Sequence, residues 1–351
     1  MGASSTATSR VPVWDNARFV AITFVVVGHG IQRFTYDSDA GLVAYLFIYA
    51  FHMPLFAIIS GYFSKSGPPT ARQMRRVITD ILVPYVIFES IWTLLHYVVE
   101  GRVSVNPTTP SWTLWFLLAL GIFRLILPYL ALLRWPLLWA VIASIGVGYF
   151  SNVDSTFSLS RAIGILPFFV LGWKLREWHL VERWRVAEAP VLWAFIDVWR
   201  ATDLRFWFFY DDSYDGLGED QWWAGAVRLS LLALAVLLSA CVFVLVPRRQ
   251  LFFTPLGQAT MYVYLLHSFV LYPIRESGII GDEITGWPWL LVMTIISIGI
   301  SFALASPWVR WAARPLVEPR PRWLLHREID TTTGPMRLGP SRTDPTGSRR
   351  G

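Results

Sequence analysis

Charged residues are scarce in this sequence. Asp, Glu, Lys and Arg make up 15 % of the 351 residues, whereas they make up roughly 25 % of a typical soluble globular domain. Hydrophobic residues reach 54 %, and the mean hydropathy is +0.47. The composition therefore excludes a soluble globular domain and a disordered chain, and it predicts a protein that lies in a membrane.

Cysteine and recognisable ligand motifs are also lacking. Cys241 is the only cysteine, which excludes a disulfide framework. The sequence has no glycine-rich phosphate loop, no internal repeat and no cluster of metal-ligand residues, so we expect no bound metal. The basic residues, which give a net charge of +6, lie in short clusters between apolar runs. This distribution is typical of membrane topology signals, so we expect contact with a lipid bilayer and no nucleic-acid partner.

Apolar stretches of membrane-spanning length recur along the chain. Each is long enough, or nearly so, to cross a hydrocarbon core about 30 Å thick as a helix. The ten stretches are 13–32, 42–64, 77–99, 112–130, 136–150, 158–175, 188–202, 221–246, 256–274 and 286–309. The stretch 188–202 is the weakest, because it is short and contains Asp197 and Arg200. The sequence thus predicts an all-α, polytopic integral membrane protein with about ten transmembrane helices.

The loops between these stretches alternate in charge. Loops after the second, fourth, sixth and eighth stretches are basic, and the opposite loops are acidic. The positive-inside rule then places both termini in the cytoplasm, provided that 188–202 is kept as a span. We expect a multi-pass protein of a bacterial plasma membrane, with a membrane domain over 1–311. Residues 312–351, rich in Arg, Pro, Thr and Gly, are expected to form a disordered basic cytoplasmic tail.

The first apolar stretch contains three ionisable residues. Each such side chain costs at least ~2.5–3.5 kcal/mol at the centre of a membrane helix, so it needs a reason. Arg18 and His29 are eleven residues apart, and Asp15 precedes Arg18 by three, so all three share one helix face. The imidazole lies roughly 16 Å along the helix from the guanidinium. Asp15 and Arg18 could equally form an interfacial ion pair, and His29 could be a polar packing contact beside Gly28 and Gly30.

The second stretch and the segment after it add further candidates. His52 lies near mid-membrane, two residues before Pro54, and either forms a site or satisfies the Ala50 carbonyl that the proline frees. Ser60 is either a helix–helix contact or a site residue. The basic segment that follows acts either as an orientation signal or as an anion site; its arginines are Arg72, Arg75 and Arg76.

Two weaker candidates and one aromatic run complete the set. Glu89 is expected to make an interhelical hydrogen bond, and His267 lies at mid-depth in the ninth stretch. The run RFWFFY at 205–210 and the acidic loop after it are expected to face outward. Its aromatic rings could stack on a carbohydrate, but anchoring at the membrane interface is the simpler interpretation.

Several of these segments, taken in order, have a familiar pattern. The segments DNARFVAITFVVVGHG, FHMPLFAIISGYF, LVPYVIFE, TLWFLLAL and YLLHSFVL together resemble the integral-membrane acyltransferase-3 family, in particular the branch related to fucose 4-O-acetylases. The resemblance covers about residues 10–310, and the family's Arg-x10-His motif falls on Arg18 and His29. It implies a ten-helix domain that acylates, usually acetylates, carbohydrate hydroxyls from cytoplasmic acyl-CoA. Many relatives carry a soluble C-terminal domain; with only a short tail here, we expect the helices and outer loops to handle the acceptor.

The resemblance and the ionisable residues together predict a mechanism. His29 is the general base or a transient acyl carrier, since acyl transfer to an alcohol needs a group that takes the hydroxyl proton. Arg18, with Arg72, Arg75 and Arg76, would bind the CoA phosphates, and Asp15 would orient Arg18. His52 and Ser60 would line the acyl path or stabilise the tetrahedral intermediate. The expected partners are acetyl-CoA or another acyl-CoA and a carbohydrate or lipid-linked glycan acceptor.

Two other functions are compatible with the sequence. A proton-coupled transporter or flippase of envelope glycan precursors would also use buried histidines and broken helices. However, a transporter usually shows interrupted helices at matching positions of two halves, and that pattern is not evident here. A non-catalytic membrane partner of an envelope biosynthesis complex is the third possibility.

Overall fold

The computed structural model describes most of the chain as helices joined by short turns. The described residues are 11–36, 38–68, 70–101, 106–153, 156–178, 204–219, 221–276, 286–320 and 324. Every regular element within these ranges is helical. They belong almost entirely to one compact unit, Met1–Pro319. The predicted span 188–202 and nearly all of the predicted tail lie outside the described residues.

Helices within these ranges coincide with each predicted span except 188–202. Many begin at a proline in the first turn, where its missing N–H costs nothing. The elements are α1 (Pro12–Gly30), η1 (Gln32–Thr35), α2 (Asp39–Tyr62), α3 (Ala71–Val77), η2 (Ile78–Leu82), α4 (Val83–Glu100), α5 (Trp115–Leu130), α6 (Pro136–Val147), η3 (Thr156–Ser158), α7 (Leu159–Glu177), α9 (Leu204–Trp207), α10 (Ala224–Leu245), η5 (Thr254–Ala259), α11 (Thr260–Glu276), α12 (Trp287–Leu304) and α13 (Pro307–Val317).

Five of the described helical segments are long and apolar enough to cross a membrane. They are Asp39–Tyr62, Ala71–Val99, Thr156–Glu177, Ala224–Leu245 and Trp287–Leu304. Two shorter apolar helices are α5 and α6. The prediction of a helical membrane protein is therefore confirmed. The count of ten spans and the cytoplasmic side of the termini stay predictions.

The third helical segment begins earlier than predicted. Thr70 and Gln73 form a reciprocal capping box that starts α3 at Ala71, and α3 continues through the π-helical turn η2 into α4. Arg72, Arg75 and Arg76 consequently lie on a helix that continues the membrane segment. The sequence had placed them in a surface segment before the helix.

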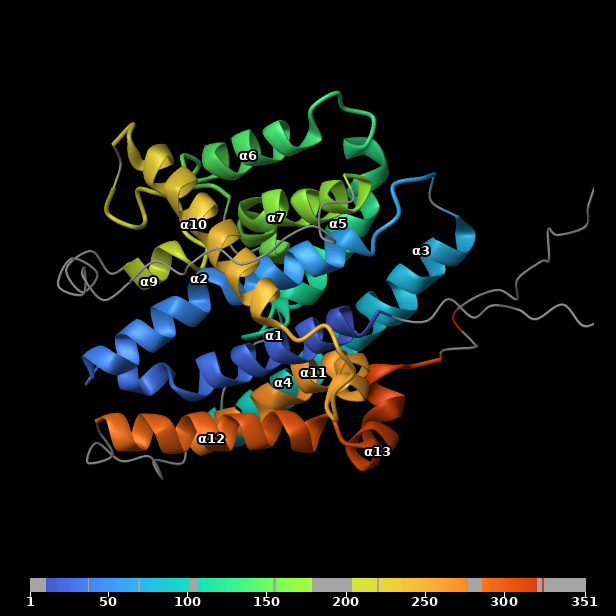
Figure 1. Cartoon of the computed structure of the whole chain (residues 1–351), viewed down its shortest axis with the longest axis vertical. Coiled ribbons are helices and arrows are strands. Elements are labelled where there is room, and N and C mark those ends of the chain that lie inside the picture. The colour runs from blue at the N-terminus through green and yellow to red at the C-terminus, as the bar shows by residue number, and fades with distance from the viewer. Residues whose placement is uncertain are drawn as a thin grey trace, which may run out of the picture. The chain divides into compact units, whose positions relative to one another are not determined.

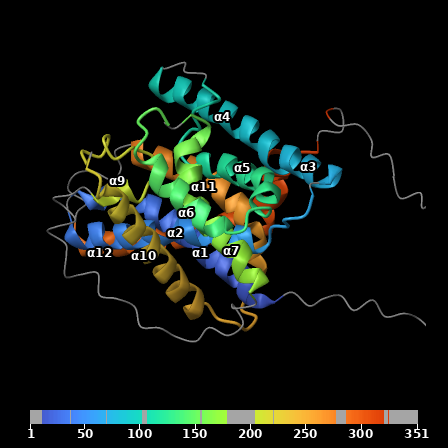
Figure 2. The same cartoon turned by 90° about the horizontal axis from the view of Figure 1, so that it is seen from above.

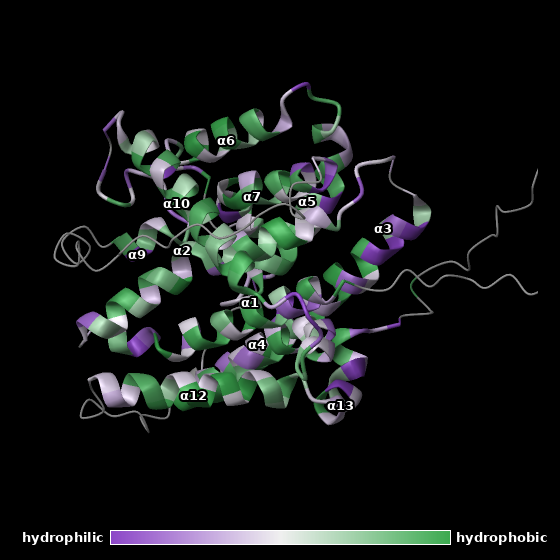
Figure 3. Cartoon of the chain, viewed as in Figure 1, coloured by the Kyte–Doolittle hydropathy of each residue, from purple (hydrophilic) through white to green (hydrophobic). Residues whose placement is uncertain are grey.

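The predicted start of the tail at residue 312 falls inside α13. This helix is amphipathic, because Ala313 and Val317 are buried while Trp308 and Trp311 are exposed. Its arginines had suggested a disordered tail by composition, but they alternate with apolar residues at helical spacing. Hydrophilic residues interrupt the apolar surface of the helices most clearly on α3 and α13 (Figure 3).

Helix α1 lies at the centre of the bundle. It packs against α2, α11, α12 and the turn η5, and its neighbours surround it in both views (Figures 1 and 2). Because α1 is enclosed, its polar residues face protein, and its face can form part of an internal site. The helices α3 and α13 lie at one end of the bundle, and α9 lies at the opposite end (Figure 1).

Helices α2 and α7 make an especially close contact. A Cβ at Gly61 of α2 would lie 1.9 Å from the Phe169 carbonyl oxygen, and a Cβ at Gly172 of α7 would lie 2.0 Å from that of Ile58. Each helix thus places its backbone against a glycine of the other, as small residues allow in membrane bundles. This contact fixes the position of α2, which carries His52 and Ser60.

Candidate active site

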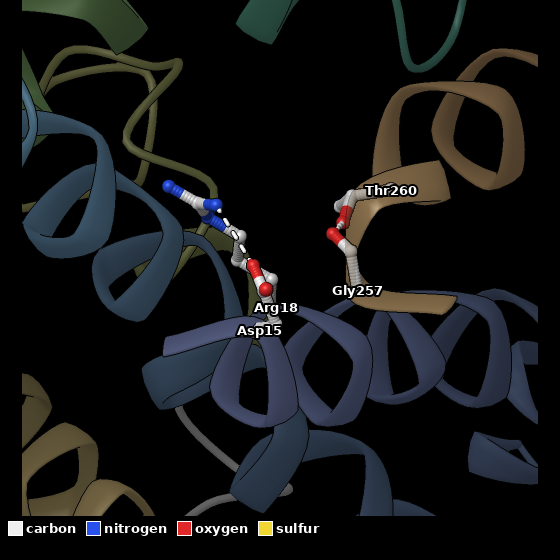
Figure 4. Close-up of polar contacts among 4 residues, drawn as sticks. All are labelled: Asp15, Arg18, Gly257 and Thr260. Carbon is white, nitrogen blue, oxygen red and sulfur yellow. Dashed lines mark hydrogen bonds and ion pairs between the residues drawn. The ribbon is translucent and has the colours of Figure 1, made fainter. Parts of the chain in front are cut away.

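The ion pair on α1 is the first part of the site. Arg18 Nη1 donates to Asp15 Oδ1 at 3.2 Å, as the helix spacing predicted. The pair lies opposite the turn from η5 into α11, where the Thr260 hydroxyl donates to the Gly257 carbonyl at 2.6 Å (Figure 4). A Cβ at Gly257 would lie 2.0 Å from the Asp15 carbonyl oxygen, so only glycine permits this approach. Asp15 is buried here and holds Arg18 in place.

Arg18 lines a cavity of about 270 Å³, here named the Arg18 cavity. Its polar lining consists of Arg18, Ser60, Ser64, Arg124, Thr260 and the hydroxyl-bearing Tyr264. The rest is apolar, from α1, α2, α5 and α11, and the Arg18 guanidinium lies 4.4 Å from the ring centroid of Phe63. The cavity offers two guanidinium groups beside an apolar channel.

His29 lines a second and larger cavity of about 370 Å³, here named the His29 cavity. It receives side chains from α1, α2, α5, α7, α11, the segment 109–113 and the segment 208–211. His52 and Tyr49 of α2 share this cavity with His29. The Tyr49 hydroxyl lies 3.3 Å from His29 Nδ1.

The two cavities meet at three side chains. Val25, Met53 and Tyr264 line both of them. Arg18 and His29 therefore line two adjacent cavities along α1, roughly 16 Å apart at 1.5 Å per residue, with these three side chains between them. The imidazole faces a cavity rather than lipid.

Two histidines, His29 and His52, line the His29 cavity, and the ring of a third, His267, lies behind His29. His52 Nδ1 lies 2.8 Å from the Ile48 carbonyl, and His267 Nδ1 lies 2.7 Å from the Tyr264 carbonyl. Since a carbonyl only accepts, we assign the Nδ1 proton in both rings, which leaves each Nε2 with a lone pair. The carbonyl that His52 satisfies is that of Ile48, whereas the sequence pointed to Ala50.

His267 contacts the ring of His29 directly. Their centroids are 5.4 Å apart, and His267 is fully buried. Its Nε2 atom has no hydrogen-bond partner among the described residues. Such an atom is an acceptor for a proton held on its neighbour. His267 therefore belongs to the site more closely than its sequence position indicated.

The segment before α5 is held against the cavity by hydrogen bonds. Glu89 accepts from the Ser111 backbone N–H at 3.0 Å and from its hydroxyl at 2.6 Å. The Tyr264 hydroxyl donates to the Thr113 carbonyl. Glu89 thus positions the loop that carries Trp112, whose ring centroid lies 5.5 Å from that of His29.

The aromatic run at 205–210 is not a membrane anchor. Trp207, Phe208 and Tyr210 are buried, and residues 208–210 line the His29 cavity. Anchoring at the interface requires exposed rings, so that interpretation was wrong. The next residue, Asp211, accepts a hydrogen bond from Arg161 of α7 in an ion pair inside the same cavity.

The sequence-predicted residues fall into three places. His29 and His52 line one cavity, Arg18 and Ser60 line the other, and Asp15 supports Arg18. The α3 arginines line neither cavity, so their role in binding CoA stays a prediction. Sequence reasoning missed Arg124 and Arg161, although both lie inside predicted spans, where the cost of a buried charge could have marked them.

Comparison with known proteins agrees with this geometry. Residues 11–306 match the family model described as an acyltransferase domain, Acyl_transf_3. The chain is 25 % identical over 327 residues to the nodulation protein NolL of Mesorhizobium japonicum (strain LMG 29417 / CECT 9101 / MAFF 303099), which covers 84 % of this chain and 86 % of that protein. No solved structure matches the chain. The family match spans nearly all the described residues, and the chain therefore belongs to the acyltransferase-3 family of membrane acyltransferases.

Proposed function

We propose that this protein is an O-acetyltransferase that moves an acetyl group from acetyl-CoA, supplied from the cytoplasm, to a hydroxyl of a carbohydrate or glycoconjugate in the bacterial plasma membrane. One observation carries the proposal: the Arg18 cavity and the His29 cavity meet at Val25, Met53 and Tyr264. A donor held by its phosphates near Arg18 can extend its thioester through the protein to the imidazole.

The donor end of the path suits a phosphate-bearing ligand. Guanidinium groups bind phosphate oxygens in pairs, and Arg18 and Arg124 present two of them beside the channel. Arg76 of α3 lies close enough to Arg124 to act on it electrostatically. Arg76 therefore extends the positive surface outward from Arg124, beside the carboxylate of Asp80, and attracts the anionic donor.

The His29 cavity suits the transfer step. His29 takes the proton of the acceptor hydroxyl as its oxygen attacks the thioester carbonyl carbon, which forms a tetrahedral intermediate. The carbon–sulfur bond then breaks, the acetyl group stays on the acceptor oxygen, and the proton passes to the departing CoA thiolate. His267, whose ring centroid lies 5.4 Å from that of His29 and whose Nε2 has no partner among the described residues, stabilises the imidazolium formed in between.

His52 and Tyr49 have different tasks in this scheme. The Nδ1 proton of His52 is committed to the Ile48 carbonyl, so its Nε2 accepts rather than donates. His52 is thus suited to orient a hydroxyl or amide N–H of a substrate. The Tyr49 hydroxyl, beside His29, can donate to the oxyanion of the intermediate. Ser60, in the Arg18 cavity, lies on the donor path.

A transport function is less well supported. Membership of an acyltransferase family points to covalent transfer, and the meeting point of the cavities lies beside a potential base rather than along a row of ion ligands. We therefore retain the transporter only as an outcome of the experiment.

The test is acetyl transfer in membranes that contain the protein. Membranes are incubated with radiolabelled acetyl-CoA, and their glycans are analysed by mass spectrometry. His29→Ala should lower covalent incorporation by about 10²–10⁴-fold, the usual contribution of a general base. His96→Ala is the matched control, because His96 lines neither cavity.

The outcomes separate the functions. Incorporation that depends on His29 and not on His96 supports the acetyltransferase. Full incorporation by the His29→Ala protein would remove this residue from the mechanism. Uptake of label without covalent transfer would favour the transporter instead.

A further inference from the structure

Several residues that line the His29 cavity carry buried polar atoms without a partner among the described residues. Five residues that line the cavity each have a buried side-chain N or O atom without a hydrogen-bond partner among the described residues. They are Thr113 Oγ1, Ser158 Oγ, Arg161 Nε, Tyr210 OH and Asp211 Oδ1. Buried polar groups are nearly always paired, so several unpaired atoms at one cavity need an explanation.

The same wall has an unusual backbone. Among the described residues, the non-glycine residues with positive φ are Trp112 (41°), Phe157 (51°), Ser158 (56°) and Tyr210 (56°). Trp112, Ser158 and Tyr210 line the His29 cavity, and Phe157 is next to Ser158. Left-handed backbone is disfavoured for such side chains and gathers at ligand sites, where the surrounding structure holds it.

The charges on this wall cancel. Arg161 donates to Asp211, and the Arg161 guanidinium lies 5.3 Å from the Trp115 ring centroid. Each partner keeps one unpaired atom, a donor on Arg161 and an acceptor on Asp211. Donor and acceptor atoms at a neutral pair, beside aromatic rings, match the hydroxyls and apolar faces of an uncharged sugar ring. Arg228, buried 4.8 Å from the Tyr210 ring centroid, is a further cation, but it does not line the cavity.

We propose that Ser158, Arg161, Tyr210 and Asp211 form the acceptor subsite and that they bind an uncharged, polyhydroxylated sugar ring with one hydroxyl directed to His29. The inference rests on the proposed function and names the part of the cavity that recognises the acceptor. The donor enters from the Arg18 cavity, so the two substrates use different walls and meet at His29.

Two tyrosines of the same segment give a matched pair of variants. The Tyr210 hydroxyl has no partner among the described residues, so Tyr210→Phe removes no hydrogen bond seen in the structure and keeps the ring beneath Arg228. The Tyr214 hydroxyl donates to the Ile145 carbonyl at 2.9 Å and does not line the cavity. Ser158→Ala is a second variant that, like Tyr210→Phe, removes an unpaired hydroxyl.

The experiment measures sugar binding and stability in lipid nanodiscs. The probes are the methyl glycosides of glucose, galactose, rhamnose and fucose, with methyl glucuronide as the anionic probe, and binding is detected by saturation-transfer NMR. Tyr210→Phe and Ser158→Ala should each weaken binding about threefold to tenfold, the worth of one hydrogen bond. The melting temperatures of these two variants should equal or exceed that of the wild type. Tyr214→Phe should lower the melting temperature and leave sugar binding unchanged.

The proposal fails if no neutral glycoside binds, if Tyr210→Phe and Ser158→Ala bind as the wild type does, or if methyl glucuronide binds more tightly than methyl glucoside. Acetyl-CoA binding to the same nanodiscs, measured by calorimetry, tests the proposed donor site separately from the proposed acceptor subsite. Acetyl-CoA binding without glycoside binding overturns the subsite alone. Glycoside binding without acetyl-CoA binding overturns the donor assignment and supports the subsite.

Discussion

At the scale of single residues, the contact between His29 and His267 is the most informative feature. The His267 Nδ1 proton is held by backbone carbonyls of its own helix, which directs the acceptor Nε2 to the interior. A ring fixed in this way can stabilise a neighbouring imidazolium without rearranging. In the proposed mechanism, His267 is thus a positioning residue for His29.

We predict that His267→Phe lowers kcat for acetyl transfer by about tenfold to hundredfold, the worth of a hydrogen bond to a charged group. The KM for acetyl-CoA should not change, because His267 lines neither cavity. His267→Gln, whose amide can both donate to the backbone and accept from His29, should recover part of the loss. Steady-state kinetics on the three proteins checks this, and an equal rise in KM would indicate a structural role.

Asp212 provides a pH-dependent prediction. Burial, followed by the adjacent Asp211, raises the pKa of Asp212 above its ordinary value of 3.8. A raised carboxyl pKa means that ionisation weakens the folded state. Stability is therefore lost as the pH rises through 3.8 and then through the folded-state pKa.

Asp212→Asn should accordingly raise the melting temperature at neutral pH, and its advantage should shrink as the pH falls toward 3.8. Melting curves of the wild type and Asp212→Asn in nanodiscs, recorded between neutral pH and pH 3.8, test the direction of this change. A difference that grows on acidification would contradict it.

At the scale of helices, the α2–α7 contact shows how the bundle is held. Backbone meets backbone at Gly61 and Gly172, where a carbonyl group cannot move aside. Overpacking at such a point typically costs about 1–3 kcal/mol. The cost would also displace α2 and the residues it brings to the two cavities.

We predict that Gly61→Ala and Gly172→Ala each lower the melting temperature and the activity together. Gly299→Ala is the control, since a Cβ at Gly299 of α12 meets nothing within 4 Å. That change should be neutral or slightly stabilising, because alanine favours helix by roughly 1 kcal/mol over glycine. If all three variants lose stability and activity equally, the close contact between α2 and α7 is not the cause of the loss.

The helices and the site differ in how far the sequence predicts them. Apolar length locates the long described helices, though not α3, α9 or α13, and the spacing of Arg18 and His29 predicts their shared face, since both effects act within one segment. Arg161 and Asp211 are fifty residues apart, and their pairing depends on how α7 and the segment after α9 pack. No local pattern records that packing.

The prediction that the aromatic run at 205–210 anchors the protein at the membrane interface was wrong for a related reason. Aromatic residues are equally suited to a membrane interface and to a cavity wall, and only the tertiary contacts of Trp207, Phe208 and Tyr210 decide between them. Composition likewise hid the end of α13, because Arg314 lies in the stretch whose composition is typical of a basic tail.

At the scale of the whole molecule, the cations divide into a lining set and a surface set. Arg18 and Arg124 line the Arg18 cavity, whereas Arg72 and Arg76 are exposed on α3. Exposed charges act through a screened field, and cavity charges act by direct contact. The two sets should therefore differ in their response to salt.

We predict that Arg18→Ala raises the KM for acyl-CoA about tenfold or more, with little dependence on salt. Arg72→Ala combined with Arg76→Ala should raise it less, and this effect should fade as ionic strength increases. The acceptor KM should change little in either protein. Kinetics at low and high salt, with Arg134→Ala as the control, tests whether the cavity arginines and the surface arginines differ in this way. An equal rise in the KM for both substrates would argue for a structural role.

The meeting point of the two cavities has a consequence for the cell. A path that accepts one substrate from each side of a membrane would dissipate the proton gradient if it stayed open between turnovers. Among the described residues, Val25, Met53 and Tyr264 are common to both cavities, so in the proposed scheme these side chains also act as the permeability barrier. Substituting small residues for them should turn the catalyst into a leak, visible as a fall in membrane potential even when both substrates are absent.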